Sequence, residues 1–344
     1  GALLALQRTE GRLGDLPAEF LTPPWFLICV LPLSTVSLIW SFILWRIASV
    51  LLLGSCSLYF ISTYSRSRFE FFLLNALAIS LLPMWQVVEF GQLSALLLLG
   101  MTFLHASLRQ NSLLLAVLSG AFLSLKPQLT FLVPILLIVW FARRVHRKVA
   151  IGYVTGFMLP LIVTALVDSQ LMFNWFDLMS TREQTVSQVP VIARSAASLA
   201  NRLRFWIFPG NGFAEHSFVA IALCLAGGIA FLLALMFRQD LPSDEKLAHI
   251  AVVGSLLATP YVLFYDFTLL LPALLFVAVR SLERSRFTLL GLLVATQFLL
   301  FFQWLFIAKT HDEFWWYAVA VFFLIVKCRA RERENEKRNA SFCC

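Results

Sequence analysis

The sequence predicts an all-α fold, that of a polytopic helical membrane protein with about ten to twelve transmembrane or re-entrant helices. Of its 344 residues, 60% are apolar and only 13% are charged, and the mean hydropathy is +0.83. An ordinary soluble domain is roughly 45–50% apolar and about 25% charged. A soluble globule of this length has too large a surface to hide such an apolar excess from water. These observations exclude a soluble enzyme, a disulfide-rich secreted scaffold and a disordered chain.

Each predicted helix is an apolar run with few or no charges, and about 20 such residues cross a bilayer. The runs are 25–45, 47–63, 70–84, 91–108, 111–125, 128–142, 149–168, 215–237, 247–262, 266–279, 287–308 and 314–326. Several are only about 15 residues long, which is short for a straight span. We therefore predict that some are tilted, broken or re-entrant, as happens where polar backbone lines a protein-walled cavity.

The loops between these runs alternate between rich and poor in Lys and Arg. The basic residues gather at Arg66, Arg68, Arg109, Arg143, Arg144, Arg147, Lys148, Arg238, Lys246, Arg280, Arg284 and Arg286 and in the C-terminal tail. The poor loops are 85–90, 126–128, 260–265 and 309–313. The positive-inside rule then predicts a multi-pass protein of the plasma (inner) membrane with a cytoplasmic C-terminus. The net charge of +8 reflects this asymmetry and not nucleic-acid binding, because the basic residues are scattered.

The chain divides into three predicted parts. An outer-face loop at 1–24 precedes a transmembrane helical domain at 25–327, and a basic cytoplasmic tail follows at 328–344. The helical domain includes a long outer loop at 169–214, in which Val191–Phe208 mixes arginines with apolar and aromatic residues. That pattern predicts an amphipathic helix lying in the membrane interface.

The start of the helical domain has two interpretations. Either 25–45 is a full span, or Trp25–Val36 dips into the membrane and returns, as Pro23, Pro24 and Pro32 favour. In the second case Arg46 lies inside the next span, where it needs a partner or a water-filled cavity. The sequence leaves this open.

Three isolated charges inside apolar segments are the first functional candidates, because an ionisable residue is costly there. Glu89, Lys126 and Asp266 all fall at predicted outward helix ends, which indicates a polar cavity on that side. Pro127 follows Lys126 and breaks the helix, so a cation stands at an interrupted span. Such a cation suits a lipid-linked phosphate, but it is equally compatible with a lysine that snorkels from a helix end.

Several polar neighbours join these charges. Gln92, after the flexible Gly91, can offer both a donor and an acceptor to a sugar hydroxyl, or simply bond a neighbouring helix. Asp266, beside Tyr265, could act as a general base, although capping the following helix is the ordinary role of such an acid. Arg182, in the outer loop, is either a binding residue or a solvated loop arginine.

No metal site or cofactor is expected. The five histidines lack metal-ligand spacing, and the six cysteines form no Cys-x-x-Cys pair. No phosphate-binding glycine loop and no Gly-x-Ser-x-Gly elbow occur, so the sequence does not support soluble nucleotide chemistry.

Taken in order, these segments resemble glycosyltransferase family 87, the polyprenol-phosphate-mannose-dependent α-mannosyltransferase-like proteins with a GT-C fold. The resemblance rests on Gly91-Gln92-Leu93-Ser94, Lys126-Pro127-Gln128, Arg143-Arg144, Thr22-Pro23-Pro24-Trp25, Ala258-Thr259-Pro260-Tyr261, Tyr265-Asp266 and Leu271-Pro272. It runs from about residue 1 to residue 325, and Thr22 stands where a tyrosine is usual.

The resemblance implies transfer of a hexose, mannose above all, from a polyprenyl-phosphate carrier to a lipid or glycan acceptor on the outer membrane face. It implies a catalytic role for Asp266. It also implies substrate binding by Gln92, Lys126, Gln128, Tyr261 and Tyr265. Glu89 and Arg182 are added to these candidate binding residues because of their predicted outward positions. The expected partners are therefore the lipid-linked donor, the acceptor and membrane lipid.

The sequence departs from the family pattern at its start. The family's main catalytic aspartate is expected just after a first transmembrane helix, and residues 1–24 contain neither that helix nor a matching acid. Asp15 lies in the wrong local context. The resemblance thus implies that the chain is N-terminally truncated.

A secondary transporter or lipid-sugar flippase is the alternative function, since it would also contain broken helices and sparse intramembrane charges. Transporter sites usually lie near the bilayer midplane between internal repeats. Here the charges fall at helix ends and no repeat is visible, which favours the enzyme.

Overall fold

A computed structural model describes the parts of the chain that carry the argument. These are residues 24–26, 31–174, 225–230, 232–233, 237, 243–259, 262–283, 287–306 and 314–328. Within them the chain forms helices and turns and no β-strand, so the all-α prediction is confirmed. The predicted interfacial helix Val191–Phe208 and most of the loop 169–214 lie outside the described residues, as do the segment 1–23 and the tail 329–344.

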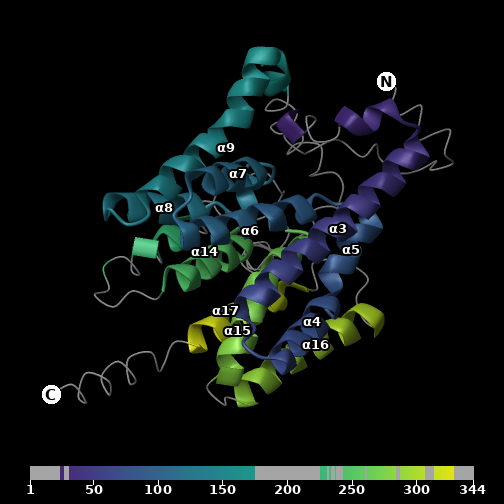
Figure 1. Ribbon diagram of the computed structural model, residues 1–344, viewed down its shortest axis with the longest axis vertical. Helices are drawn as coiled ribbons and strands as arrows, with labels where there is room; N and C mark the ends of the chain where they lie inside the picture. Colours follow the sequence, from purple (N-terminus) through teal and green to yellow (C-terminus); the bar gives the residue numbers. More distant parts are fainter. Residues whose placement is uncertain are drawn as a thin grey trace, which may run out of the picture.

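The described helices follow one another in the order in which the apolar runs predict them. They are η1 (Pro24–Phe26), η2 (Leu31–Thr35), α3 (Leu38–Tyr64), α4 (Arg68–Ile79), α5 (Leu82–Phe90), α6 (Ser94–Gln110), α7 (Leu113–Leu123), η3 (Pro127–Leu129), α8 (Leu132–Ala142), α9 (Arg147–Val167), α14 (Asp244–Ala258), η4 (Phe264–Leu270), α15 (Leu271–Glu283), α16 (Phe287–Phe306) and α17 (Trp315–Lys327). In Figure 1, α7, α8 and α9 form one group, while α4, α15, α16 and α17 form another, with α6 and α14 between them.

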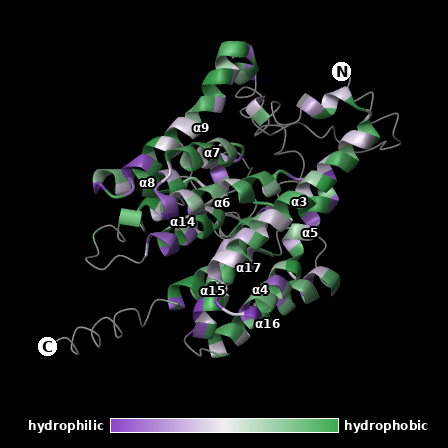
Figure 2. Cartoon of the chain, viewed as in Figure 1, coloured by the Kyte–Doolittle hydropathy of each residue, from purple (hydrophilic) through white to green (hydrophobic). Residues whose placement is uncertain are grey.

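Four of the described stretches are long and apolar enough to cross a membrane, and the bent pair α4 and α5 makes a fifth. Their burial differs sharply. In α3, only 11% of the most apolar 18-residue stretch is buried inside the protein. In the stretch formed by η4 and α15, the corresponding share is 89%. The η4–α15 stretch is therefore the centre of the bundle, and α3 presents most of its surface outward. Figure 2 shows the apolar residues spread over the helices.

The N-terminal part corrects one predicted boundary. The runs 25–45 and 47–63 are not two helices divided at Arg46, because α3 is continuous from Leu38 to Tyr64. Before it, η1 and η2 form the broken element that the prolines predict. The helix tolerates Arg46 because its guanidinium finds a backbone acceptor, Glu89 O, at 2.6 Å.

A second correction concerns the predicted loop 85–90. These residues are the last part of α5, which ends only at Phe90 and is closed by Gly91 in the left-handed conformation (φ 62°). Glycine adopts that conformation without a steric penalty. Glu89 is thus in the last helical turn, and the turn toward the next helix begins two residues later.

Helices α7 and α9 approach each other unusually closely, because small residues form their interface. A Cβ added at Gly120 would lie 2.1 Å from Tyr153 O, and one added at Gly156 would lie 1.8 Å from Val117 O. Gly152 and Gly156 stand four residues apart, the small-xxx-small spacing that brings membrane helices together. This contact holds α7, whose C-terminal end leads into Lys126, against α9.

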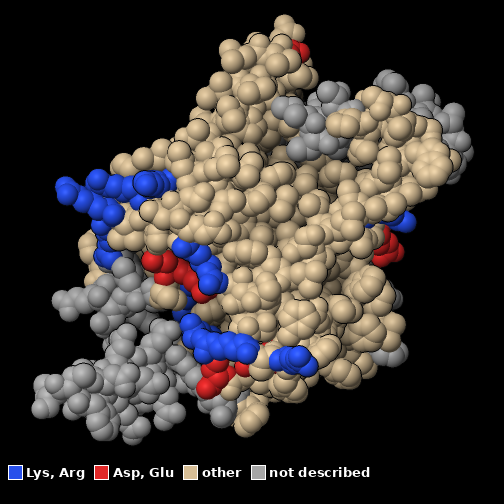
Figure 3. Space-filling model, viewed as in Figure 1, with Lys and Arg blue, Asp and Glu red and all other residues tan. Residues whose placement is uncertain are grey.

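The basic helix ends gather at one end of the bundle, as the alternation of loops predicts. Arg66, at the end of α3, contacts Glu283, at the end of α15, at 2.8 Å. His146, before α9, contacts Asp244, the first residue of α14, at 2.8 Å. In Figure 3 most charged side chains lie along the left and lower edges, over these helix ends, and the rest of this face is nearly uncharged.

Candidate functional site

A buried ion pair lies at the opposite end of the bundle from these basic residues. Lys126 Nζ lies 2.8 Å from Asp266 Oδ1, although the two residues are 140 positions apart. The Lys126 side chain is 12% exposed and that of Asp266 only 1%. Two of the three isolated charges in the sequence therefore meet, in surroundings where a lone charge would be costly.

Asp266 is held by two further donors. Ser94 Oγ, on the first residue of α6, donates to Asp266 Oδ1 at 2.8 Å, and the backbone N–H of Leu263 donates to Oδ2 at 3.1 Å. The bond to Leu263 caps η4, so the capping interpretation of this acid is confirmed. Three donors therefore reach the two carboxylate oxygens of Asp266.

Lys126 lies at the break between α7 and η3, as Pro127 predicts. Helix α7 ends at Leu123 and η3 begins at Pro127, so that Lys126 has a non-helical backbone. Its Nζ lies 5.0 Å from the centre of the Tyr265 ring, within the range of a cation–π contact. Lys126, Tyr265 and Asp266 therefore form one cluster.

The other predicted binding residues surround this cluster more loosely. Gln92 is half-buried two residues before Ser94, and its backbone N–H closes α5 on Val87 O at 3.0 Å. Within the described part of the chain no hydrogen bond joins its side chain to the ion pair. Glu89 is exposed beside the turn at Gly91, which is the first break between helices, and Gln128 is exposed beside the second break, at Lys126. Arg182 and Tyr261 lie outside the described residues.

Two tryptophans support the two breaks, and the sequence analysis missed both. Trp25 Nε1 donates to Ser124 O at 3.2 Å, two residues before Lys126, and Trp45 Nε1 donates to Gly91 O at 2.8 Å. Phe26 packs edge-on against Trp45, with ring centroids 6.1 Å apart. The Pro-Pro-Trp sequence was the available signal, because an indole N–H buried among apolar side chains needs an acceptor.

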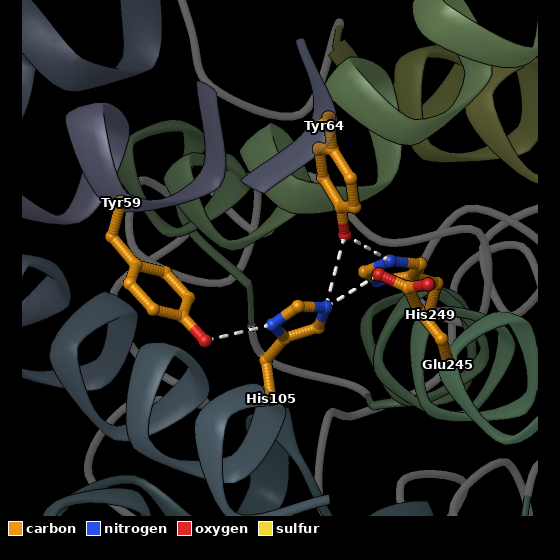
Figure 4. Close-up of polar contacts among 5 residues, drawn as sticks. All are labelled: Tyr59, Tyr64, His105, Glu245 and His249. Carbon is orange, nitrogen blue, oxygen red and sulfur yellow. Dashed lines mark hydrogen bonds and ion pairs between the residues drawn. The ribbon is translucent and has the colours of Figure 1, made fainter. Parts of the chain in front are cut away.

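A second polar cluster occupies the basic end of the bundle (Figure 4). His105 of α6 contacts Glu245 of α14, and its Nδ1 lies 3.1 Å from Tyr59 OH. Tyr64 OH lies 3.1 Å from His249 Nε2. These five side chains link α3, α6 and α14, although among the described residues no group of three His, Cys, Asp or Glu side chains is arranged to hold a metal ion.

The pKa of Glu245 reflects this cluster. Burial alone would raise the pKa of the carboxyl, but the hydrogen bond from His105, with the nearby positive charge, outweighs burial and lowers it to about 2. Glu245 is in the first turn of α14, outside the helices long enough to span a membrane. Sequence reasoning did not find this cluster, because its members are far apart in the chain and none has a motif.

The two clusters are carried by the same helices. Ser94 and His105 are eleven residues apart on α6, which corresponds to about 16 Å along a helix axis. The Lys126–Asp266 end, with its interrupted helices, offers a cation, a carboxylate, an aromatic ring and a serine hydroxyl together. That combination can hold an anionic group and exchange a proton with a hydroxyl.

Comparison with known proteins now identifies the family. The model of glycosyltransferase family 87 matches residues 20–260, more than half of the chain, including Ser94 and Lys126. No match is found among the curated proteins or among the solved structures. The match confirms the resemblance seen in the sequence, and the chain therefore belongs to glycosyltransferase family 87.

Proposed function

We propose that this membrane glycosyltransferase moves a hexose, most simply mannose, from a polyprenyl-phosphate carrier to a lipid or glycan acceptor on the outer face of the plasma membrane. The buried contact of Lys126 with Asp266, at an interrupted end of the bundle, is the observation that carries the proposal. A buried charge pair that costs desolvation is typical of a functional site more than of a stabilising one.

Lys126 is proposed to hold the carrier phosphate. In the reaction the bond between the sugar C1 and the phosphate oxygen breaks, and its electron pair stays on the phosphate. The phosphate gains negative charge as it leaves, so a fixed ammonium lowers the transition-state energy. Tyr265, whose ring lies beside Lys126 Nζ, supports the position of that ammonium.

Asp266 is proposed to change role during the cycle. While Lys126 contacts it, the buried carboxylate is occupied by three donors, Lys126 Nζ, Ser94 Oγ and the Leu263 N–H. When the donor phosphate draws Lys126 away, Asp266 loses its strongest partner and can accept the proton of the acceptor hydroxyl. The acceptor oxygen then forms the new bond to C1.

A turnover assay on the full-length gene product tests this function. The protein is placed in lipid nanodiscs with polyprenyl-phosphate mannose and an acceptor extract, and release of polyprenyl phosphate is followed. Lys126→Ala is expected to lower kcat on the order of a hundredfold, as loss of one charge-stabilising donor does. Arg68→Gln, which changes an exposed cation outside the cluster, should leave turnover unchanged.

Two results would contradict the proposal. One is turnover by Lys126→Ala equal to that of the unmodified protein. The other is wild-type transfer from a nucleotide sugar with none from the lipid-linked donor, which would keep the family but remove the carrier phosphate from the mechanism.

A further inference from the structure

Arg46 is a cation on a mostly apolar, outward-facing helix. It is the ninth residue of α3, and its guanidinium carbon lies 4.1 Å from the centre of the Phe42 ring. Its Nη2 donates to Glu89 O, in the last turn of α5, at 2.6 Å. The proposed function gives this residue no role.

Within the described part of the chain Arg46 has no ion-pair partner, and its Nε is buried with no hydrogen-bond acceptor. Lys126 differs, because Asp266 neutralises it, and Arg66 differs because it contacts Glu283. A guanidinium carries five N–H donors. Arg46 uses one of them on Glu89 O and its Nε–H is buried, so its remaining Nη donors are those left for an external anion.

The surface around Arg46 suits the apolar part of an amphiphile. Large apolar side chains of α3 are exposed on both sides of it in the chain: Ile39, Trp40, Phe42, Ile43, Leu44 and Ile47. A positive charge beside such a surface complements a molecule with an anionic head and a long apolar tail. Arginine is also the side chain best suited to a phosphate, which it can bind through two parallel hydrogen bonds.

Arg46 is connected to the candidate site through one short segment, residues 89–94. Trp45 and Arg46 bond the backbone of α5 and of its closing turn at Gly91 and Glu89. Three residues after Gly91, Ser94 donates to Asp266. The segment from Glu89 to Ser94 thus contacts Arg46 at its start and the buried Asp266 carboxylate at its end.

We propose that Arg46 is the docking contact for the phosphate of a polyprenyl-phosphate lipid, whose chain lies along the exposed face of α3. This inference rests on the proposed function and adds a second, earlier phosphate site to it. The lipid phosphate meets Arg46 at the surface while Lys126 is still paired with Asp266. It then passes to Lys126 on entering the site.

Binding without turnover tests this inference. The full-length protein in neutral-lipid nanodiscs is titrated with sugar-free polyprenyl monophosphate, and the bound fraction is measured by native mass spectrometry. Arg46→Gln is expected to weaken binding about tenfold, as loss of a charge-assisted contact does. Arg46→Lys, which keeps the charge, is expected to weaken it by about threefold or less. Arg68→Gln is the matched control and should bind as the unmodified protein does, provided that all variants melt at similar temperatures.

The outcomes separate this inference from the proposed function. Equal binding by Arg46→Gln and the unmodified protein overturns it, and so does equal binding of uncharged polyprenol. Equal displacement by phosphatidylglycerol or by inorganic phosphate also overturns it, because Arg46 would then be a general anion contact. If the protein binds polyprenyl phosphate through Arg46 but transfers no sugar, the docking contact stands and the proposed transfer fails.

Discussion

At the scale of single residues, the contact of Lys126 with Asp266 decides both chemistry and stability. Removing one partner leaves the other charge buried and uncompensated, which typically costs about 3–5 kcal/mol. Replacing both with neutral side chains avoids that penalty. The pair therefore gives a way to separate a stabilising role from a functional one.

We expect Lys126→Met to destabilise the protein by about 3–5 kcal/mol. The double variant Lys126→Met/Asp266→Asn, which removes both charges and keeps an amide oxygen to accept from Ser94 or Leu263, should recover part of the loss. Both variants should turn over the lipid-linked donor at least about a hundredfold more slowly than the unmodified protein. Thermal unfolding in detergent, with turnover measured on the same samples, provides the check. A double variant as unstable as the single one would show that the two side chains do not depend on each other.

Glu245 gives a second prediction at the residue scale. The pKa of this carboxyl in the folded chain, about 2, lies below its ordinary value of 4.5. As the pH falls below about 4.5, the unfolded chain takes up a proton before the folded one, so acid favours unfolding. The groups that face or act on Glu245 are His105, His249 and Tyr64, with Arg109 near the tyrosines.

We therefore expect the melting temperature to fall as the pH is lowered from about 4.5 toward 2, and this slope to be smaller in Glu245→Gln. Asp168→Asn, which changes an exposed acid at the end of α9, is the control and should keep the slope of the unmodified protein. An unchanged slope in Glu245→Gln would mean that other acids determine acid unfolding.

At the scale of elements, the close approach of α7 and α9 positions the break at Lys126. The backbone of each helix occupies the space that a side chain on the other would need, at Gly120 and at Gly156. The hydrophobic effect does not drive helices together within lipid, because lipid tails are as apolar as the side chains. Close van der Waals packing therefore supplies much of the attraction between α7 and α9.

Gly156→Ala should therefore separate α7 from α9 and cost about 1–3 kcal/mol, the usual cost of overpacking. Gly54→Ala and Gly291→Ala are matched controls in α3 and α16, because nothing lies within 4 Å of a Cβ added at either position. They should be neutral or slightly stabilising, since alanine favours helix over glycine. Equal melting temperatures for Gly156→Ala and the controls would show that the interface adjusts without cost.

At the scale of the whole molecule, the chain has two chemically different ends. The Lys126–Asp266 cluster lies at one, and the basic helix ends, with the cluster of His105 and Glu245, lie at the other. The positive-inside rule places the basic end in the cytoplasm. With this orientation, the proposed sugar transfer at the Lys126 end is predicted to take place on the outer side.

Thiol labelling checks this orientation. With the other cysteines replaced by serine, Gln128→Cys should react with a membrane-impermeant maleimide in intact cells, because Gln128 is exposed at the Lys126 end. In a second variant that keeps only Cys343 and Cys344, these two thiols should react only after the membrane is opened. The reverse pattern would place the candidate site in the cytoplasm.

The sequence alone determined the helical membrane fold, the order of its helices, the break at Lys126 and the family. These depend on local properties: apolar runs, the helix-breaking action of Pro127, and short motifs of consecutive residues. Local properties also misplaced the boundary at Arg46, because the acceptor that makes a continuous α3 possible comes from another helix.

Only the tertiary structure decided which polar residues meet. Lys126 and Asp266 stand out in the sequence as isolated charges, but nothing local says that they pair with each other, or that Ser94 joins them. The acceptors of the two tryptophans and the cluster around His105 could not be predicted either, because their hydrogen bonds join distant segments. The physical reason is that a buried polar group is satisfied by whichever partner the packing of the helices brings within reach.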